Sequence, residues 1–199
     1  MTTSWLKQNA RRIDKARALL RPALNGAGPV WADLGCGEGV FTYLLHELLP
    51  SPSTVYAVDK DRRALQALAR NLAEAALKAE LQPIHADFTR PLSLPPLDGL
   101  LLANALHFVK DKKPVLTQAL SYLKPGGRLV VVEYNASRGN WAVPYPVDEG
   151  GFIALAAAAG LQGAQIVARA PSTFLGEMYT GRGSRGAGEQ GGRGDKVTR

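Results

Sequence analysis

Short apolar runs alternate with segments of helical periodicity along most of this chain of 199 residues. The runs at residues 29–34 and 99–103 have the length of buried strands, and leucines between residues 61 and 80 recur on one stripe of a helix. Strands that are each followed by a helix build a sheet that is covered by helices on both faces. We therefore predict an α/β fold with a doubly wound sheet.

The same alternation gives the expected elements. The expected strands cover residues 29–34, 54–58, 82–85, 99–103, 128–134, 164–168 and 173–179. The expected helices cover residues 14–24, 40–49, 61–80, 115–123 and 148–159. The fourth strand is apolar throughout, which is typical of a parallel strand that is buried on both faces.

Charge and composition separate the two ends of the chain from its body. The net charge is +7, of which residues 1–28 carry +5, residues 29–180 carry −1 and residues 181–199 carry +3. We predict a folded domain over residues 29–180. We also predict a basic helical lid over residues 1–28. Its main features are Trp5, Arg11, Arg12 and Lys15.

The last segment, residues 181–199, holds seven glycines and almost nothing apolar. Such a composition cannot bury enough surface to fold, so we predict a disordered tail. We interpret both basic ends as solvated surface, because a patch that binds phosphates is more convincing on a folded body beside a groove. An RNA contact by the Gly/Arg tail is the alternative.

Two further features exclude whole classes of protein. A single cysteine, Cys36, excludes a disulfide framework and a cysteine-rich zinc site, and we predict no metal site. No apolar run approaches the roughly 18 residues of a membrane-spanning helix, and no hydrophobic signal core precedes Arg11. We expect a cytoplasmic protein without a membrane partner.

A glycine-rich turn, Asp33-Leu-Gly-Cys-Gly-Glu-Gly39, joins the strand at residues 29–34 to the helix that begins at Val40. In an open parallel sheet, ligands bind at the carboxyl ends of the strands. The glycines let backbone amides approach a ligand, and the N-terminus of the helix adds partial positive charge. The carboxylate of Asp33 disfavours a phosphate there and favours a ligand with an ammonium or sulfonium charge.

Two more acids follow the next two expected strands. Asp59 ends the strand at residues 54–58, where a carboxylate can accept from both hydroxyls of a ribose. Asp87 follows the strand at residues 82–85, where it can accept from an exocyclic amine while Phe88 lies along an aromatic ring. Each acid taken singly is equally well explained as a helix cap or a surface charge. Three acids after three successive strands favour a ligand site.

Taken in order, five segments resemble the class I S-adenosylmethionine-dependent methyltransferases. The segments are VWADLGCGEG (30–39), VYAVD (55–59), HADF (85–88), LDGLLLANALHF (97–108) and LKPGGRLVVVE (123–133). The resemblance covers residues 29 to about 180. It implies a Rossmann-like, seven-stranded sheet that is mostly parallel with a reversed C-terminal strand. It also implies S-adenosylmethionine as cofactor and S-adenosylhomocysteine as product.

The resemblance also implies which residues contact the cofactor. Asp59 would hold the ribose, and Asp87 with Phe88 would hold the adenine. Asp33 would lie beside the methionine ammonium, directly or through water, and Lys60 would pack on the adenine or remain an exposed lysine. The other implied cofactor contacts are Gly35, Cys36, Gly37 and Gly39 at the methionine, and Asn104 after the fourth strand.

The methyl acceptor is expected beyond the fourth and fifth strands. The segment Asn104-Ala-Leu-His107 lacks the Asn/Asp-Pro-Pro-aromatic motif of relatives that methylate amino groups of bases, so it resembles the small-molecule branch. Our candidate catalytic residues are His107 as a general base, Tyr134 and Tyr145. Our candidate acceptor contacts are Phe108, Glu133 and Trp141. Packing of His107 and anchoring of the loop by Trp141 and Tyr145 are the alternatives.

Three kinds of function remain open. The first is a methyltransferase that acts on an O, N, S or C atom of a small molecule. The second is an RNA or protein methyltransferase that uses the basic ends, and the third is a cofactor-binding subunit without activity of its own. Transfer from a sulfonium donor depends mainly on alignment, so the sequence leaves the acceptor and the oligomeric state open.

Overall fold

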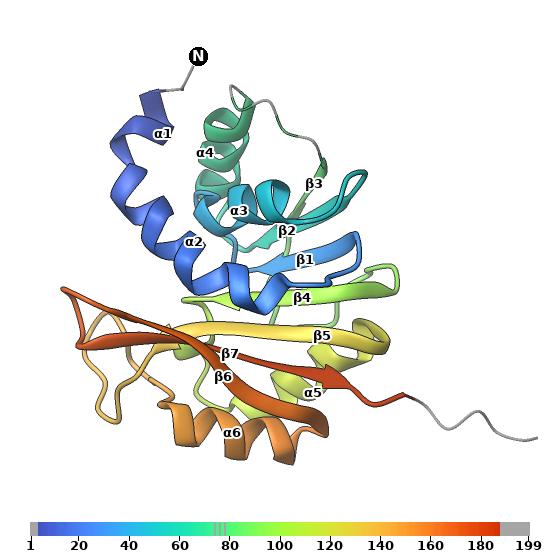
Figure 1. Cartoon of the computed structure of the whole chain (residues 1–199), viewed down its shortest axis with the longest axis vertical. Helices are drawn as coiled ribbons and strands as arrows, with labels where there is room; N and C mark the ends of the chain where they lie inside the picture. Colours follow the sequence, from blue (N-terminus) through green and yellow to red (C-terminus); the bar gives the residue numbers. More distant parts are fainter. Residues whose placement is uncertain (1–3, 74, 76, 78, 188–199) are drawn as a thin grey trace, which may run out of the picture.

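A seven-stranded sheet with the order β3-β2-β1-β4-β5-β7-β6 forms the centre of the molecule (Figure 1). The computed structural model describes residues 4–73, 75, 77 and 79–187. The strands are β1 (Val30–Leu34), β2 (Thr54–Asp59), β3 (Glu80–His85), β4 (Leu97–Ala103), β5 (Leu123–Tyr134), β6 (Leu161–Pro171) and β7 (Glu177–Arg185). The α-helices are α1 (Ser4–Gln8), α2 (Ala10–Leu24), α3 (Val40–Leu48), α4 (Arg62–Ala73), α5 (Lys112–Tyr122) and α6 (Glu149–Ala158), with a 3₁₀ turn, η1, at Leu106–Phe108.

The sheet is parallel except at β7, which runs antiparallel to both β5 and β6. This arrangement confirms the predicted seven-stranded sheet with one reversed C-terminal strand. The chain winds outward in one direction through β1, β2 and β3, and in the other direction from β4 onward. A ligand site is therefore expected at the carboxyl ends of β1 and β4, where the direction of winding changes.

Successive residues of the central strands point to opposite faces of the sheet, and helices cover both faces. On one face, Leu101 of β4 and Val130 of β5 pack with the buried residues of α2 and α3. On the other face, Leu100 and Leu102 pack with the buried residues of α5 and α6, among them Phe152. Because β4 is enclosed on both faces, its apolar sequence needs no alternation with polar residues. None of the described helices is both long and apolar enough to cross a bilayer.

The C-terminal boundary differs from our prediction. We expected the last strand at residues 173–179 and a disordered tail from residue 181, but β7 runs from Glu177 to Arg185. The glycines that suggested disorder are required by packing. A Cβ at Gly181 would lie 2.3 Å from the Phe152 ring, and one at Gly183 would lie 2.5 Å from Leu161. The predicted tail from residue 188 onward lies outside the described residues.

Two helices also differ from our prediction. The leucine stripe suggested a helix to residue 80, whereas α4 ends at Ala73, and no glycine or proline between these positions marks that end. Within residues 1–28, α2 is helical as expected, but it is more than a lid. Leu19, Leu20 and Ala23 are buried, so most of this helix belongs to the core.

Candidate cofactor and acceptor site

A cavity of about 780 Å³ opens at the carboxyl ends of the parallel strands. Its volume is in the usual range for a small-molecule site. Its wall consists of the glycine turn (35–39), Val40 and Phe41 of α3, Asp59 and Lys60 after β2, Asp87, Phe88 and Thr89 after β3, residues 103–105 with Phe108 and Val109 after β4, and Arg12 of α2. The fold thus joins five separate segments of the sequence in one wall.

The glycine turn requires glycine for two physical reasons. Gly35 has φ of 79°, a left-handed conformation that favours glycine, and a Cβ there would lie 2.7 Å from the Cβ of Ala105. Gly37 has φ of 53°, and a Cβ there would meet no atom within 4 Å. The turn therefore packs tightly against the segment after β4 at Gly35 and exposes open backbone at Gly37.

Asp59 connects the glycine turn to the end of β2. Its Oδ2 accepts from the backbone N–H of Gly37 at 2.8 Å, and its Oδ1 accepts from the N–H of Asp61 at 2.8 Å. Each carboxylate oxygen has a further lone pair, so Asp59 can still accept hydrogen bonds from a ligand in the cavity that it lines.

Asp87 and Phe88 form the wall beyond β3. The Asp87 carboxylate accepts from both the hydroxyl and the backbone N–H of Thr89, and these bonds lower its pKa below the ordinary value. Phe88 lies beside the glycine turn, because its ring is 3.3 Å from the Cβ position of Gly35. A carboxylate acceptor and an aromatic ring therefore both lie in this part of the wall. Lys60 also lines this part of the cavity.

Asp33 lies beneath the turn rather than in the cavity wall, so the structure does not support direct contact with a ligand. The side chain is 1% exposed and accepts a hydrogen bond from the Thr42 hydroxyl at 2.7 Å. Burial raises the pKa of Asp33 to about 7, although the bond from Thr42 works in the opposite direction. Cys36 does line the cavity, and burial raises the pKa of its thiol.

Asn104 is a wall residue whose side chain has a polar atom without a hydrogen-bond partner among the described residues. It has φ of 54°, an uncommon conformation for a residue with a side chain, and its N–H donates to Val132 at 2.8 Å. Its Oδ1 is enclosed and has no hydrogen-bond partner among the described residues. A buried amide oxygen without a partner costs free energy, which a donor on a bound ligand would recover.

Glu133 and His107 form a buried pair behind the wall. Glu133 Oε2 lies 2.7 Å from His107 Nδ1, and its Oε1 accepts from the N–H groups of Leu106 and His107 at 2.9 and 3.1 Å. Glu133 is fully buried and His107 is 3% exposed, and neither lines the cavity. The structure therefore contradicts the predicted contact between Glu133 and a substrate. The carboxylate instead holds the segment after β4.

The remaining predicted residues are divided between the wall and the surface. Phe108 lines the cavity and is 60% exposed, whereas Tyr134, Tyr145 and Trp141 do not line it. Trp141 is 91% exposed, so it does not form the predicted pocket wall in this conformation. The Tyr134 ring is tilted by 53° against the ring of His107 and by 57° against that of Phe174, at centroid distances of 6.0 and 5.7 Å.

Sequence reasoning missed several residues of the wall. Phe41 and Thr89 were detectable only by adjacency, because each follows a predicted site segment by one or two positions. Arg12 was expected in a lid and not as a cavity residue, and only the packing of α2 beside α3 brings it there.

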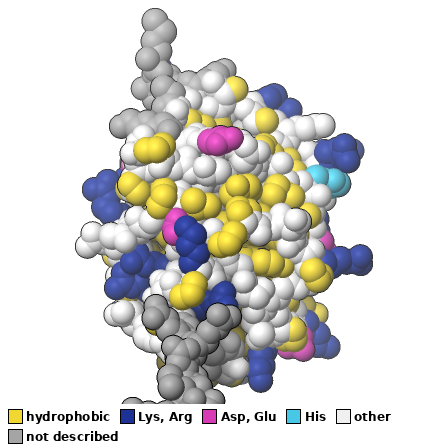
Figure 2. All heavy atoms as spheres, turned by 90° about the vertical axis from the view of Figure 1, so that its right-hand side faces the viewer, with side chains coloured by type: hydrophobic (Ala, Val, Ile, Leu, Met, Phe, Trp, Pro, Cys, Tyr) yellow, Lys and Arg dark blue, Asp and Glu magenta, His cyan; other side chains and the backbone are white. Residues whose placement is uncertain are grey.

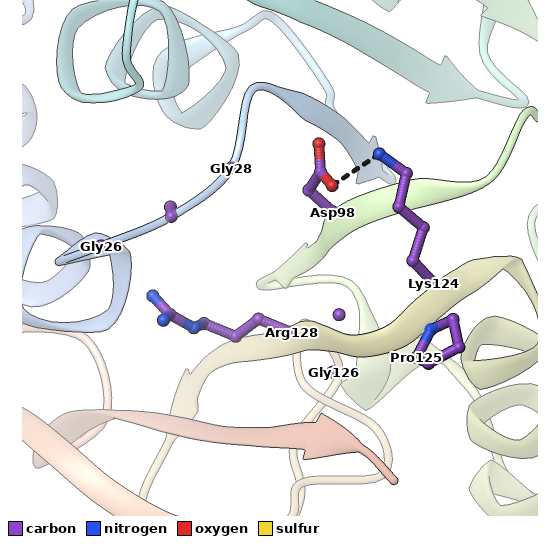
Figure 3. Close-up of a pocket in the computed structure, with 9 residues that line it drawn as sticks. Gly26, Gly28, Asp98, Lys124, Pro125, Gly126 and Arg128 are labelled. Atoms are coloured by element: carbon purple, nitrogen blue, oxygen red, sulfur yellow. Dashed lines mark hydrogen bonds and ion pairs between the residues drawn. The ribbon is translucent and has the colours of Figure 1, made fainter. Parts of the chain in front are cut away.

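A second hollow, of about 210 Å³, lies near the start of β1 and is lined by Gly28, Asp98, Lys124 and Arg128 (Figure 3). Its charges are already paired. Lys124 is 2.6 Å from Asp98, whose other oxygen accepts from the N–H of Val30. The Arg128 guanidinium donates to the carbonyls of Ala23 and Asn25 at the end of α2. We interpret this hollow as a structural junction.

The sheet order, the reversed β7 and the cavity beside the glycine turn define a class I S-adenosylmethionine-dependent methyltransferase. A family model described as a methyltransferase domain matches residues 27–158. The chain belongs to this methyltransferase-domain family. The unpartnered oxygen of Asn104, the open backbone at Gly37 and the carboxylates of Asp59 and Asp87 fit S-adenosylmethionine, which is the cofactor of this class.

Similar proteins agree with this family. The chain is 33% identical over 129 residues to a trans-aconitate 2-methyltransferase of Azoarcus sp. (strain BH72), a match that covers 64% of this chain and 47% of that protein. It is 33% identical over 102 residues to an uncharacterized 37.1 kDa transposon protein of Streptomyces fradiae, covering 51% and 29%. The chain thus matches less than half the length of these curated relatives.

Solved structures share the fold. The crystal structure of the N-methyltransferase NodS from Bradyrhizobium japonicum WM9 has a TM-score of 0.71 at 18% identity, covering 91% of this chain and 99% of that one. The complex of NodS with S-adenosylhomocysteine has a TM-score of 0.66 at 16% identity, covering 92% and 88%. At such identities the comparison establishes the fold alone.

Proposed function

We propose that this protein transfers a methyl group from S-adenosylmethionine to a small-molecule acceptor. The observation that carries the proposal is the continuity of one cavity from the glycine turn and Asp59 to Asn104 and Phe108. A ligand at the first group therefore has the second group as its neighbour. The name of a trans-aconitate 2-methyltransferase among the similar proteins supports a small acceptor.

When bound, S-adenosylmethionine supplies a methyl group already activated on sulfonium. The protein has to align an acceptor atom with that methyl group, and good alignment corresponds to effective molarities of about 10⁵–10⁸ M. Asn104 and Phe108 are placed for this task because they line the cavity after β4. Glu133 acts through them, since it holds the backbone of Leu106 and His107.

His107 has a positioning role in this proposal. Its Nδ1 lies 2.7 Å from the buried Oε2 of Glu133, and this contact orients the ring. A general base must reach the proton that it removes, and the ring is almost completely enclosed. Neither Tyr134 nor Tyr145 lines the cavity, and both contact His107: the Tyr134 ring lies 6.0 Å from its ring, and the backbone N–H of Tyr145 donates to its carbonyl.

An RNA or protein acceptor, which the basic ends of the chain would serve, has less support than a small-molecule acceptor. Figure 2 shows the face at the amino ends of the parallel strands, opposite to the cavity, and on this face Lys and Arg side chains are dispersed and do not gather in one patch. Several arginines are also engaged within the fold, such as Arg17 with Glu47 and Arg169 with Glu149. Macromolecular recognition usually requires a continuous basic surface.

The test is a methyl-transfer assay with labelled S-adenosylmethionine on a metabolite panel that includes trans-aconitate, and in parallel on total RNA and on unfolded protein. We expect label in one or a few small molecules. Asp59→Ala should reduce that label and Asp61→Ala should retain it, because only Asp59 lines the cavity. Label only in RNA or protein would overturn the proposal, and so would binding of the cofactor without transfer to any acceptor.

A further inference from the structure

Arg12 is the arginine that α2 contributes to the wall of the cavity. Its neighbours Ile13 and Ala16 are buried, so the helix itself is fixed against the sheet. Ile13 belongs to the same apolar cluster as Phe41 of α3 and Tyr134 of β5. The exposed side chain of Arg12 therefore projects from a rigid helix toward the region between the glycine turn and the acceptor side.

The guanidinium of Arg12 lines the cavity and has no hydrogen bond or ion pair with any described residue, in contrast to Arg17 and Arg128. On the same helix, Arg17 lies 2.6 Å from Glu47. Arg128 donates to two backbone carbonyls at the end of α2. The acids of the wall are Glu38, Asp59 and Asp87, and none of them forms an ion pair with Arg12 among the described residues.

Electrostatics place Arg12 close to the acceptor side. Burial raises the pKa of Tyr134, and the positive charge of Arg12 partly opposes that increase. The guanidinium is thus near enough to Tyr134 to act on it, although the two side chains form no hydrogen bond. A fixed cation at this place will attract an anionic group of a bound ligand.

We propose that Arg12 binds a carboxylate group inside the cavity. The guanidinium presents a planar fork of N–H donors that matches a carboxylate and forms two parallel charge-assisted hydrogen bonds with it. Two ligands of this site can supply the carboxylate. One is the methionine end of the cofactor, and the other is the acceptor. The inference rests on the proposed function only for the second source.

The first arm of the test measures binding by calorimetry with the full chain, without any methyl transfer. The ligands are S-adenosylhomocysteine and its decarboxylated analogue, which keeps the amine. If the cofactor supplies the carboxylate, Arg12→Gln weakens S-adenosylhomocysteine about 10- to 100-fold, the scale of a hydrogen-bonded charge, and leaves the decarboxylated analogue unchanged. Arg11→Gln is the matched control, because it removes the same charge from the adjacent residue outside the cavity.

The second arm uses protein saturated with S-adenosylhomocysteine. Succinate, benzoate and trans-aconitate are titrated beside their amides. If the acceptor supplies the carboxylate, at least one acid binds more tightly than its amide to the wild type, and Arg12→Gln removes that preference. Arg12→Lys, which keeps the charge without the planar fork, should retain part of it.

The proposal is overturned if Arg12→Gln, shown to be folded by its circular dichroism and melting, changes neither arm more than Arg11→Gln does. The result is separable from that of the proposed function. A protein that binds S-adenosylhomocysteine through Arg12 but methylates no small molecule would contradict the proposed function alone. A protein that methylates neutral small molecules equally well with and without Arg12, and binds S-adenosylhomocysteine equally well, would contradict the inference alone.

Discussion

At the carboxyl edge of the sheet, the half formed by β1, β2 and β3 presents most of its predicted residues to the cavity. In the half formed by β4, β5 and β7, Asn104 and Phe108 line the cavity, whereas Glu133 and His107 are buried behind it and Trp141 is exposed away from it. Asp59 and Asp87 both line the cavity, whereas Glu133, the next-to-last residue of β5, is fully buried. The difference lies in the partners. Glu133 faces three N–H donors of the segment after β4, and it turns toward them.

This comparison shows that the end of a strand fixes where a side chain begins but not which way it faces. In the cofactor half, short bonds such as Gly37 to Asp59 tie the wall to its own turn and leave lone pairs for a ligand. In the acceptor half, Glu133 and His107 contact one another behind the wall, while Asn104 and Phe108 line the cavity. The acids of the cofactor half thus remain open to a ligand, whereas the acid of the acceptor half holds the backbone after β4.

The largest effect is expected from removing the C-terminal part of β7. A chain that ends after Thr180 lacks Gly181–Arg185, which pair with both β5 and β6. We expect this truncation to cost more than about 5 kcal/mol, the lower end of the stability of a typical domain, and to abolish cooperative melting. A chain that ends after Ala187 is the control, because it keeps β7 complete. Equal melting of the two chains would show that the acceptor half does not depend on this strand.

The next largest effect is expected at Glu133. Glu133→Ala leaves two backbone N–H groups and His107 without their buried acceptor, so we expect a loss of about 3–5 kcal/mol of unfolding free energy in urea. Glu149→Ala is the control, since it removes a surface pair with Arg169 and should cost at most about 1 kcal/mol. If the two variants lost the same stability, Glu133 would not be a structural residue, and it would again be a candidate for contact with the acceptor.

A smaller effect is expected from Asp33, in the cofactor half. Burial raises its pKa from 3.8 to about 7, so the folded protein keeps a proton that the unfolded chain releases at lower pH. The folded state therefore binds more protons between pH 4 and 7, and its stability falls as the pH rises through that window. We expect Asp33 to lower the unfolding free energy of the wild type by about 2–4 kcal/mol between pH 4 and 7, and we expect this decrease to be absent in Asp33→Asn.

The measurement for Asp33 is the difference in unfolding free energy between wild type and Asp33→Asn at pH 4, 5.5 and 7. The difference is needed because burial lowers the pKa of His46 to about 4, and this group makes stability rise with pH in the same window. Taking the difference cancels the contribution of His46. A difference that does not change with pH would mean that Asp33 is ionised in the folded state.

Much of the fold was predictable because each parallel strand and its helix have a local signature. The glycine turn, Asp59 and Asp87 were predictable for the same reason, since each directly follows such a strand. The continuation of β7 to Arg185 was not, because it depends on pairing with β6 and on packing against Phe152 and Leu161. The end of α4 at Ala73 was not predictable either, because no glycine or proline follows it before residue 80. Arg12 and the orientation of Glu133 depend on contacts between distant segments, which no local pattern records.

The most direct test of the cofactor site is a calorimetric titration of S-adenosylhomocysteine into the wild type, Asp59→Ala and Asp61→Ala. Asp59 lines the cavity, whereas Asp61 is exposed and serves the first turn of α4 through the N–H of Arg63. We expect one molecule bound per wild-type chain, a loss of about 1.5–3 kcal/mol of binding free energy in Asp59→Ala, and no significant loss in Asp61→Ala. A folded wild type that does not bind the ligand, or unchanged affinity in Asp59→Ala, would contradict the assignment of this cavity.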